Sequence, residues 1–354
     1  MKLLILTQKV DINDDVLGFF HRWIEEFSKH CEKIIVICLQ KGEYNLPVNV
    51  RVLSLGKEKF SHNSHRFRRL ALFYKYIWQE RKNYDSVFVH MNQQYVILGG
   101  LLWKLLNKKI GLWYAHGSVS LSLRVAEKLA DVIFTSTKSG FHVPSKKVNV
   151  VGQGIDTNKF KSQISNLKNK DIFTIISVGR ISPSKDYETL IKAVEILIKD
   201  NIKLEVNIVG GIGLPEDEKY LSNLQTMIRE KKLEEAINFA GPVPNKNIVN
   251  YLQSADLFVN MGLTGSLDKA ILEAMACGLP ILTCNEALLD VLGKYKEMPM
   301  YPKKDYKKFA EKIEFISKLN YETRKKIGED LRDIVVENHS VDGLITKILK
   351  DYDL

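Results

Sequence analysis

The sequence predicts two α/β domains, each built on a doubly wound parallel sheet. Short β-branched runs alternate with helical segments along the whole chain, which is the pattern of successive βαβ units. The chain has 354 residues, 45% of them hydrophobic, which is enough for two packed cores and long for one. A polar, lysine-rich stretch, Asn158–Asp171, separates two series of predicted strands. We therefore expect an N-terminal domain over residues 1–160, joined by a C-terminal helix over 338–354, and a second domain over 170–337.

The predicted strands follow this division. In the N-terminal domain they are Lys2–Thr7, Lys33–Leu39, Val48–Leu53, Ser86–His90, Lys109–Tyr114, Val132–Thr135 and Val148–Val151. In the second domain they are Ile172–Val178, Leu204–Val209, Ile237–Phe239, Leu257–Val259 and Pro280–Thr283. Two lysine-rich helices, Asp305–Leu319 and Glu322–Glu337, follow the last strand. Ligands bind beyond the carboxyl ends of the strands in such sheets, so the residues just after each strand are the candidates for function.

Composition and missing motifs exclude several classes of protein. No apolar run approaches the ~18–20 residues that span a bilayer. The four cysteines have neither metal-binding nor disulfide-framework spacing. No Gly-x-Gly-x-x-Gly follows the first strand and no Walker loop occurs, which argues against dinucleotide oxidoreductases and P-loop enzymes. We expect no metal and no cofactor, and a cytoplasmic location that keeps the cysteines reduced.

Two cations come directly after the first strand of the second domain. Arg180 follows Gly179, and Lys185 comes at the start of the next predicted helix. Cations near the amino end of a helix oppose its dipole, so they are poorly placed to stabilise the helix itself. A bound diphosphate would remove that conflict and accept charge-assisted hydrogen bonds from both side chains. The alternative, two solvated cations on a loop, leaves their position unexplained.

The segment Gly265–Pro280 predicts a second anion-binding feature. It runs from a buried strand into an apolar helix, and the amino end of such a helix offers N–H groups to a phosphate. The candidates for contact with a ligand at this helix start are Gly265, Ser266, Asp268 and Lys269.

Glu273 lies within the same apolar helix, where an ionised carboxylate needs a partner. A carboxylate is the usual group that holds the vicinal hydroxyls of a ribose. The alternative is an ion pair with Lys269 one helical turn earlier, which contributes only ~0.2–0.5 kcal/mol. Because Arg180 and Lys185 already indicate a site for a nucleotide diphosphate, we favour the interpretation that Glu273 holds the ribose.

Two further loops carry candidates. Gly210 follows the second strand of the second domain, where a missing side chain lets the backbone approach a ligand. His116 follows the fifth strand of the N-terminal domain and precedes Gly117. A lone histidine is more often structural than catalytic, but its place at the carboxyl end of a strand favours a position in the cleft.

A helix over Phe67–Trp78 carries two faces of different character. Its helical spacing predicts a core stripe made of Phe67, Leu70, Ala71, Tyr74, Ile77 and Trp78. A second face, basic and aromatic, consists of Arg66, Arg69, Phe73 and Tyr76. Such a face suits the headgroup region of an anionic membrane, and an ordinary solvated surface is an equal alternative.

Taken together, these motifs resemble glycosyltransferase family 4. The matching stretches are Gln153–Phe160, Ser177–Lys185, Ala255–Val259 and Leu272–Pro280. The resemblance covers nearly the whole chain and implies the GT-B fold, in which two Rossmann-like domains face each other across a cleft. It further implies a retaining, metal-independent hexosyltransferase. The second domain would hold a UDP- or GDP-sugar, and the first would hold a glycan or lipid-linked acceptor.

The resemblance also implies roles for particular residues. Arg180 and Lys185 would neutralise the donor diphosphate, and Glu273 would hold the ribose. His116 would lie beside the transferred sugar and the acceptor. His116, Arg180 and Lys185 follow strands or open a helix, as the site of such a sheet requires, and Glu273 lies inside the helix that follows the fourth strand of the second domain.

One position departs from the family pattern. Gly265 stands where the family has a first glutamate that helps to seat the transferred sugar. The sugar would then be held by other groups of this loop, with Asp268 on its hydroxyls and Lys269 near phosphate. The departure leaves the identity of the sugar open.

Two alternatives of other kinds remain. The same fold could support epimerisation or phosphorolysis of a sugar nucleotide. The basic stretch Lys57–Lys82 could instead belong to a non-catalytic protein that binds nucleic acid or membranes. The candidate residues at the strand ends argue against a non-catalytic binding protein, so we expect no nucleic-acid partner. We expect a location in the cytoplasm or on the inner face of the membrane.

Overall fold

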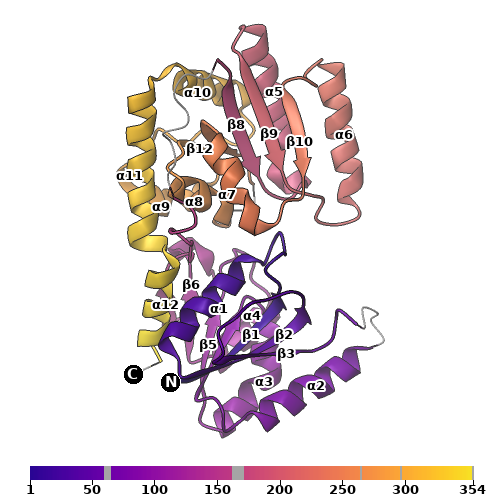
Figure 1. Cartoon of the computed structure of the whole chain (residues 1–354), viewed down its shortest axis with the longest axis vertical. Coiled ribbons are helices and arrows are strands. Elements are labelled where there is room, and N and C mark those ends of the chain that lie inside the picture. Colours follow the sequence, from indigo (N-terminus) through magenta and orange to yellow (C-terminus); the bar gives the residue numbers. More distant parts are fainter. Residues whose placement is uncertain (60–64, 162–170, 264, 296, 353–354) are drawn as a thin grey trace. The chain divides into compact units, whose positions relative to one another are not determined.

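The computed structural model describes residues 1–59, 65–161, 171–263, 265–295 and 297–352 (Figure 1). These residues form two compact units. Unit 1 comprises Met1–Gly154, Pro244–Lys246 and the chain from Val341 onward, and unit 2 comprises Ile155–Val243 and Asn247–Ser340. The boundary thus lies before Ile155 and not after residue 160 as expected. Ile155 is fixed within unit 2 because its N–H donates to the carbonyl of His339 at 2.7 Å.

Unit 1 is built on a parallel sheet that, in the described residues, has seven strands in the order β3-β2-β1-β4-β5-β6-β7. The strands are β1 (Lys2–Val10), β2 (Lys33–Lys41), β3 (Val50–Ser54), β4 (Ser86–His90), β5 (Lys109–Trp113), β6 (Val132–Thr135) and β7 (Val148–Val150). All seven were predicted from their β-branched runs. Because the chain runs outward in opposite directions from β1 and β4, the switch point of the sheet lies between these two strands.

Helices cover both faces of this sheet because side chains alternate along each strand. Leu3 and Ile5 of β1 pack into a core with α1 (Phe19–His30) and α12 (Val341–Lys350). Leu4 and Leu6 face the opposite core. The helices that contribute to that second core are α2 (Arg66–Gln79), α3 (Gln93–Leu105) and α4 (Leu121–Leu129).

Helix α2 corrects two predictions. The predicted core stripe is wrong for Phe67, Tyr74 and Trp78, which are 85%, 40% and 51% exposed. The predicted membrane face is wrong for Phe73, which is 1% exposed and stacks on Tyr95 of α3 with ring centroids 5.8 Å apart. The helix carries apolar residues on two sides. Helical periodicity predicts both stripes but does not determine which one packs against the sheet.

Unit 2 is built on a second parallel sheet, with five strands in the described residues and the order β10-β9-β8-β11-β12. The strands are β8 (Phe173–Val178), β9 (Leu204–Val209), β10 (Ile237–Gly241), β11 (Leu257–Asn260) and β12 (Ile281–Thr283). These too were predicted. The switch point lies between β8 and β11, so the loops after these two strands open onto the position where doubly wound sheets bind ligands.

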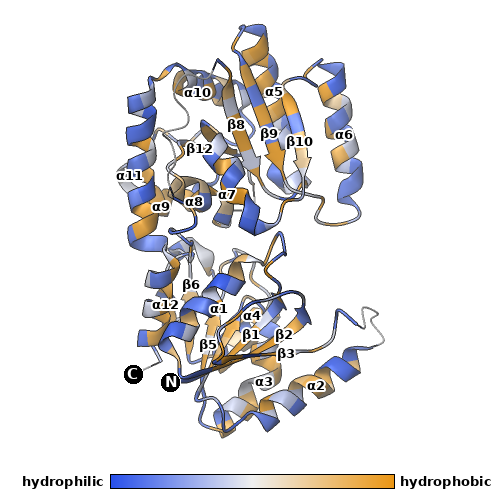
Figure 2. Cartoon of the chain, in the orientation of Figure 1, coloured by the Kyte–Doolittle hydropathy of each residue, from blue (hydrophilic) through white to orange (hydrophobic). Residues whose placement is uncertain are grey.

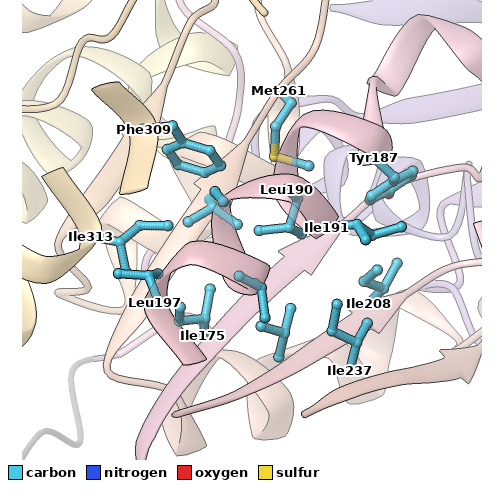
Figure 3. Close-up of a cluster of buried hydrophobic side chains, with 14 of the residues drawn as sticks. Ile175, Tyr187, Leu190, Ile191, Leu197, Ile208, Ile237, Met261, Phe309 and Ile313 are labelled. Carbon is cyan, nitrogen blue, oxygen red and sulfur yellow. The ribbon is translucent and has the colours of Figure 1, made fainter. Parts of the chain in front are cut away.

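The helices of unit 2 also form two layers. One core contains side chains of α5 (Tyr187–Lys199), α6 (Asp217–Glu230) and α10 (Tyr306–Lys318). In Figure 3, Leu190 and Ile191 of α5 lie over the strands, with Met261 and Phe309 beside them. The opposite core contains side chains of α7 (Asn245–Ser254), α8 (Lys269–Ala276), α9 (Leu289–Leu292) and α11 (Tyr321–His339). No helix in the described parts of the chain is long and apolar enough to cross a membrane.

Candidate functional site

The loops after β8, β9 and β11 are joined to one another at the carboxyl edge of the unit 2 sheet. Ile181 donates its N–H to the carbonyl of Gly211 at 2.8 Å, which links the first two loops. Leu263 donates its N–H to the carbonyl of Ser184 at 2.9 Å, which links the first loop to the third. These bonds fix the backbone around the switch point of the sheet.

Lys185 is held at the start of α8. It ends a short 3₁₀ turn (Pro183–Lys185), and α5 begins two residues later at Tyr187. Its ammonium group forms an ion pair with the carboxylate of Asp268, and the two side chains are 16% and 20% exposed. Lys185 is therefore not a solvated loop cation. A residue after β8 is brought to the helix that follows β11.

Asn260 supports this pair and was not identified from the sequence. It is the last residue of β11 and is 2% exposed. Its Nδ2 donates to Oδ2 of Asp268 at 3.0 Å, and its Oδ1 accepts from the N–H of Gly262 at 3.1 Å. The available signal was a polar amide that ends an otherwise apolar strand at the ligand-binding edge.

The amino end of α8 is not capped by its own N-cap side chain. Asp268 occupies the N-cap position, yet its carboxylate makes no capping hydrogen bond because it faces Lys185 and Asn260. An N-cap carboxylate normally accepts from the first-turn N–H groups, which otherwise need water or a ligand as acceptor. The N–H of Ile271 donates instead to the main-chain carbonyl of Asp268 at 3.2 Å, and the positive end of the helix dipole is left without a capping carboxylate.

Arg180 presents its guanidinium to solvent on the same loop as Lys185. The residue is exposed, and no hydrogen bond or ion pair to its side chain occurs among the described residues. Its aliphatic part lies over Gly213, where an added Cβ would come within 2.9 Å of Arg180 Cδ. The side chain thus follows the backbone of the β9 loop with its charge uncompensated.

Close backbone approach requires a glycine at position 210, and Gly179 lies against the Lys185 side chain. A Cβ on Gly210 would lie 2.0 Å from the carbonyl oxygen of Gly179, a contact that no side chain can tolerate. A Cβ on Gly179 would lie 3.3 Å from the Nζ of Lys185. The two glycines let the β8 and β9 loops touch and let the ammonium group lie against the backbone.

Gly265 and Ser266 shape the loop before α8. Gly265 has a φ of +66°, and a Cβ there would meet no described atom within 4 Å. A glutamate would need a left-handed backbone at this position, which disfavours side chains with a Cβ. The carbonyl of Ser266 accepts from Nδ2 of Asn285 at 2.8 Å. A side chain with a Cβ at position 265 would therefore be strained by the backbone of this loop.

Glu273 lies inside α8, 4% exposed, with two lysines as electrostatic neighbours. Burial lowers the pKa of the Lys269 ammonium to about 8, and the Glu273 carboxylate opposes that shift. Burial also lowers the pKa of Lys159, again opposed by Glu273. The carboxylate therefore compensates two partly buried lysines in addition to any part in holding a ligand.

His116 belongs to unit 1 and follows β5. Its side chain is exposed, and its Nδ1 accepts a hydrogen bond from the N–H of Ser118 at 3.0 Å. In the neutral ring this bond assigns the proton to Nε2, which is then a hydrogen-bond donor. His116 is not part of the cluster that Lys185, Asp268 and Asn260 form in unit 2.

In the described ranges, no group of three or more histidine, cysteine or acidic side chains is arranged to hold a metal ion. The polar groups that meet at the carboxyl edge of unit 2 include the cation of Lys185, the carboxylate of Asp268 and the amide of Asn260, beside the start of α8. This set suits an anionic ligand that also carries hydroxyl groups.

Comparison with known proteins identifies the family. Residues 157–333, half of the chain and including all of the unit 2 candidates, match the model of "Glycosyl transferases group 1". The chain belongs to this family. The predicted family 4 is a finer assignment that the match does not address.

Curated relatives match the chain over part of its length. The amylovoran biosynthesis glycosyltransferase AmsK of Erwinia amylovora is 30% identical over 146 residues, which is 40% of this chain and 34% of the relative. The UDP-Gal:alpha-D-GlcNAc-diphosphoundecaprenol alpha-1,3-galactosyltransferase of Escherichia coli is 33% identical over 155 residues, 41% of this chain and 38% of the relative. The chain thus spans little more than a third of the length of these two relatives.

Solved structures of this family's fold match the whole chain. Anabaena Alr3699/HepE in complex with UDP has a TM-score of 0.78 at 18% identity and covers 100% of both chains. Sucrose-phosphate synthase from Thermosynechococcus elongatus has a TM-score of 0.80 at 15% identity, covering 100% of this chain and 98% of that one. At such identities the likeness speaks for the fold alone, and it confirms the predicted GT-B fold.

Proposed function

We propose that this protein is a glycosyltransferase that moves a sugar from a nucleoside-diphosphate sugar to a glycan or lipid-linked acceptor. The observation that carries the proposal is the meeting of Lys185, Asp268 and the uncapped start of α8 at the switch point of a group 1 domain. A positive helix end with a lysine beside it suits a diphosphate. The nearby carboxylate suits sugar hydroxyls.

The diphosphate would be held by charge already in place. The doubly charged group would draw the ammonium of Lys185 away from a single carboxylate, and Arg180 would add a guanidinium that has no competing partner among the described residues. As the bond to the sugar breaks, negative charge grows on the leaving phosphate. Preorganised donors at that point stabilise the transition state more than the ground state.

Asp268 would bind the transferred sugar in place of the family's first glutamate. The family's glutamate is replaced by Gly265, whose backbone disfavours any side chain, so the carboxylate nearest the start of α8 is that of Asp268. Once phosphate engages Lys185, Oδ2 of Asp268 keeps its hydrogen bond from Asn260, and the carboxylate can accept hydrogen bonds from hydroxyl groups. Asn260 would keep this carboxylate oriented through its 3.0 Å hydrogen bond.

Retention of configuration, a hexose donor and independence from metal ions are further parts of the proposal, and they rest on the family resemblance. In a front-face attack the leaving phosphate accepts the acceptor's proton, so no enzymatic base is required. His116 would contribute its Nε2–H as a hydrogen-bond donor to a hydroxyl of sugar or acceptor.

The relatives favour a UDP-sugar and a lipid-linked or polysaccharide acceptor. One relative is named for UDP-Gal and a diphosphoundecaprenol-linked sugar, and another for colanic acid biosynthesis in Salmonella typhimurium. Structures of Anabaena HepE contain UDP, and one contains UDP-glucose. We therefore place UDP-sugars first among the candidate donors.

A thermal-shift screen against UDP-, GDP- and ADP-sugars tests this function. A donor at a hundred times its Kd stabilises the folded protein by about 2.7 kcal/mol. The donor that stabilises the protein should then yield free nucleoside diphosphate only when an alcohol acceptor is supplied. Release of sugar 1-phosphate with inorganic phosphate, or isomerised sugar without any acceptor, would favour the phosphorylase or epimerase alternative. A protein that no nucleotide sugar stabilises would contradict the proposal.

A further inference from the structure

The outer side of α2 and α3 in unit 1 exposes large apolar side chains. On α2, Phe67 is 85% exposed and Trp78 is 51% exposed. On α3, Leu101 is 68% exposed and Leu105 is 81% exposed. Burying such side chains is favourable by roughly 25 cal/mol per Å² of apolar surface, so exposing several together needs a reason. We call these four residues, together with Tyr74, the α2–α3 outer face.

These side chains form one continuous face. Phe67, Tyr74 and Trp78 recur at helical spacing along one side of α2. The hydroxyl of Tyr74 donates to the carbonyl of Leu98 in α3 at 3.0 Å, which joins the two helices. Leu98, Leu101 and Leu105 share one side of α3 by the same spacing. Both helices pack on the same side of the sheet, so their solvent sides point away from it together (Figure 1).

The charge of this face is uniformly positive. Neither α2 nor α3 contains an acidic residue. Exposed cations alternate with the apolar residues along both helices: Arg66, Arg68, Lys75 and Lys104. Glu80, which follows α2, is bound to Arg51 at 2.8 Å. Figure 2 shows hydrophilic and hydrophobic segments alternating along α2.

Trp78 has the arrangement expected at a lipid headgroup boundary. The guanidinium of Arg81 lies 4.2 Å from the centroid of its ring and also donates to the carbonyl of Trp78 at 2.6 Å. An indole that is half exposed and capped by a cation has an apolar body and a charged rim. Tryptophan and arginine side chains with this division are favoured where hydrocarbon meets headgroups.

We propose that the α2–α3 outer face docks onto an anionic lipid surface. The exposed leucines and phenylalanine enter the acyl boundary, and the surrounding arginines and lysines bind phosphate headgroups. A second copy of the chain is a poor occupant because a symmetric contact would bring the same cations together. Nucleic acid would use the cations and leave Leu101 and Leu105 in water. The surface differs from the one predicted by sequence, which included the buried Phe73.

Flotation of the full-length protein with lipid vesicles tests the inference. We expect the protein to float with vesicles of phosphatidylglycerol and phosphatidylcholine, and to stay behind with phosphatidylcholine alone. Retention should fall with added salt and persist in part at high salt, because only the electrostatic component is screened. Equal binding to both vesicle types, or to neither, would overturn the proposal.

Paired variants distinguish binding through this face from nonspecific hydrophobic adsorption to vesicles. Phe67→Ser with Leu105→Ser should weaken vesicle binding by about tenfold or more, because two inserted apolar groups are lost. The matched control is Phe315→Ser, a 58% exposed phenylalanine on α10 of unit 2. Binding that falls equally in the control, or stays unchanged in the double variant, would contradict the assignment.

A charge pair gives a test that does not alter apolar surface. Arg68→Glu with Lys75→Glu should abolish flotation with anionic vesicles, whereas Lys219→Glu with Lys307→Glu in unit 2 changes the net charge equally and should retain it. If short DNA binds the wild type as tightly as the vesicles do, and both charge pairs weaken it alike, the lipid assignment is wrong. The inference is independent of the proposed activity, because vesicle binding requires no nucleotide sugar.

Discussion

Replacing Arg180 by alanine separates function from stability more cleanly than any other single change at the site. Its guanidinium is exposed and has no hydrogen bond or ion pair within the described residues. Exposed substitutions of this kind change the free energy of unfolding by no more than ~0.5 kcal/mol. For a protein of this size the melting temperature should therefore move by less than about 2 °C.

The effect on donor chemistry should be far larger. A charge-assisted hydrogen bond to a diphosphate contributes about 1.5–3 kcal/mol, so the affinity for the nucleoside diphosphate should fall roughly 10- to 150-fold. Loss of one donor that stabilises the leaving group lowers kcat by about 10²–10³-fold. The same range is expected for Lys185→Ala, which in addition leaves Asp268 without its cation.

Titration calorimetry with the nucleoside diphosphate and initial rates of nucleotide release measure these two effects. Arg229→Ala is the matched control, since Arg229 is an exposed arginine in the last turn of α6 of the same unit, away from the carboxyl ends of the strands. Arg180→Lys should recover part of the lost affinity because it keeps the charge without the planar fork. If Arg180→Ala has the same kinetics as the wild type and Arg229→Ala, the reasoning is refuted. Arg180 would then be an ordinary solvated cation.

Three further predictions follow from the geometry. Gly210→Ala should lower the free energy of unfolding by about 1–3 kcal/mol in urea denaturation, because its Cβ would lie 2.0 Å from the carbonyl oxygen of Gly179. Gly211→Ala, whose Cβ would only touch Pro242 at 3.3 Å, should be much milder, and equal losses would refute the packing argument. His116→Ala should lower kcat by about 2- to 12-fold, the scale of one neutral hydrogen bond, and leave nucleotide affinity unchanged; a parallel loss of affinity would contradict the proposal that unit 2 alone holds the nucleotide. Relative to Lys269→Met, the free energy of unfolding of the wild type should rise as the pH increases from about 8 to 9, because the Lys269 pKa, lowered by burial to about 8, makes this residue bind more protons in the unfolded chain than in the folded chain. An unchanged slope in Lys269→Met would show that this residue is not its source.

The strands and the ligand-binding edge could be predicted because their signals are local. A β-branched run such as Leu204–Val209 carries its own periodicity, and a cation directly after a strand is visible in the sequence. The partner of that cation is not visible in this way. Lys185 and Asp268 are 83 residues apart, and only the strand order brings β8 beside β11. The sequence could place each residue at the right edge without showing that they form an ion pair.

Helix α2 shows the other limit. Its two apolar stripes fit the same helical period, so the pattern cannot decide which one faces the sheet. The choice depends on shape: Phe73 fits against Tyr95 and Trp103 of α3, with ring centroids 5.8 and 6.2 Å away. Asn260 was overlooked for a related reason, since an amide at a strand end gains significance only when its partner is known.

A crystal structure with a nucleoside diphosphate bound tests the central claim most directly. We predict phosphate oxygens within hydrogen-bonding distance of the Lys185 ammonium and of the N–H groups that begin α8, with the Arg180 guanidinium turned onto the same phosphates. A nucleotide bound at another edge of unit 2, with Lys185 still paired to Asp268 and neither cation touching phosphate, would contradict it.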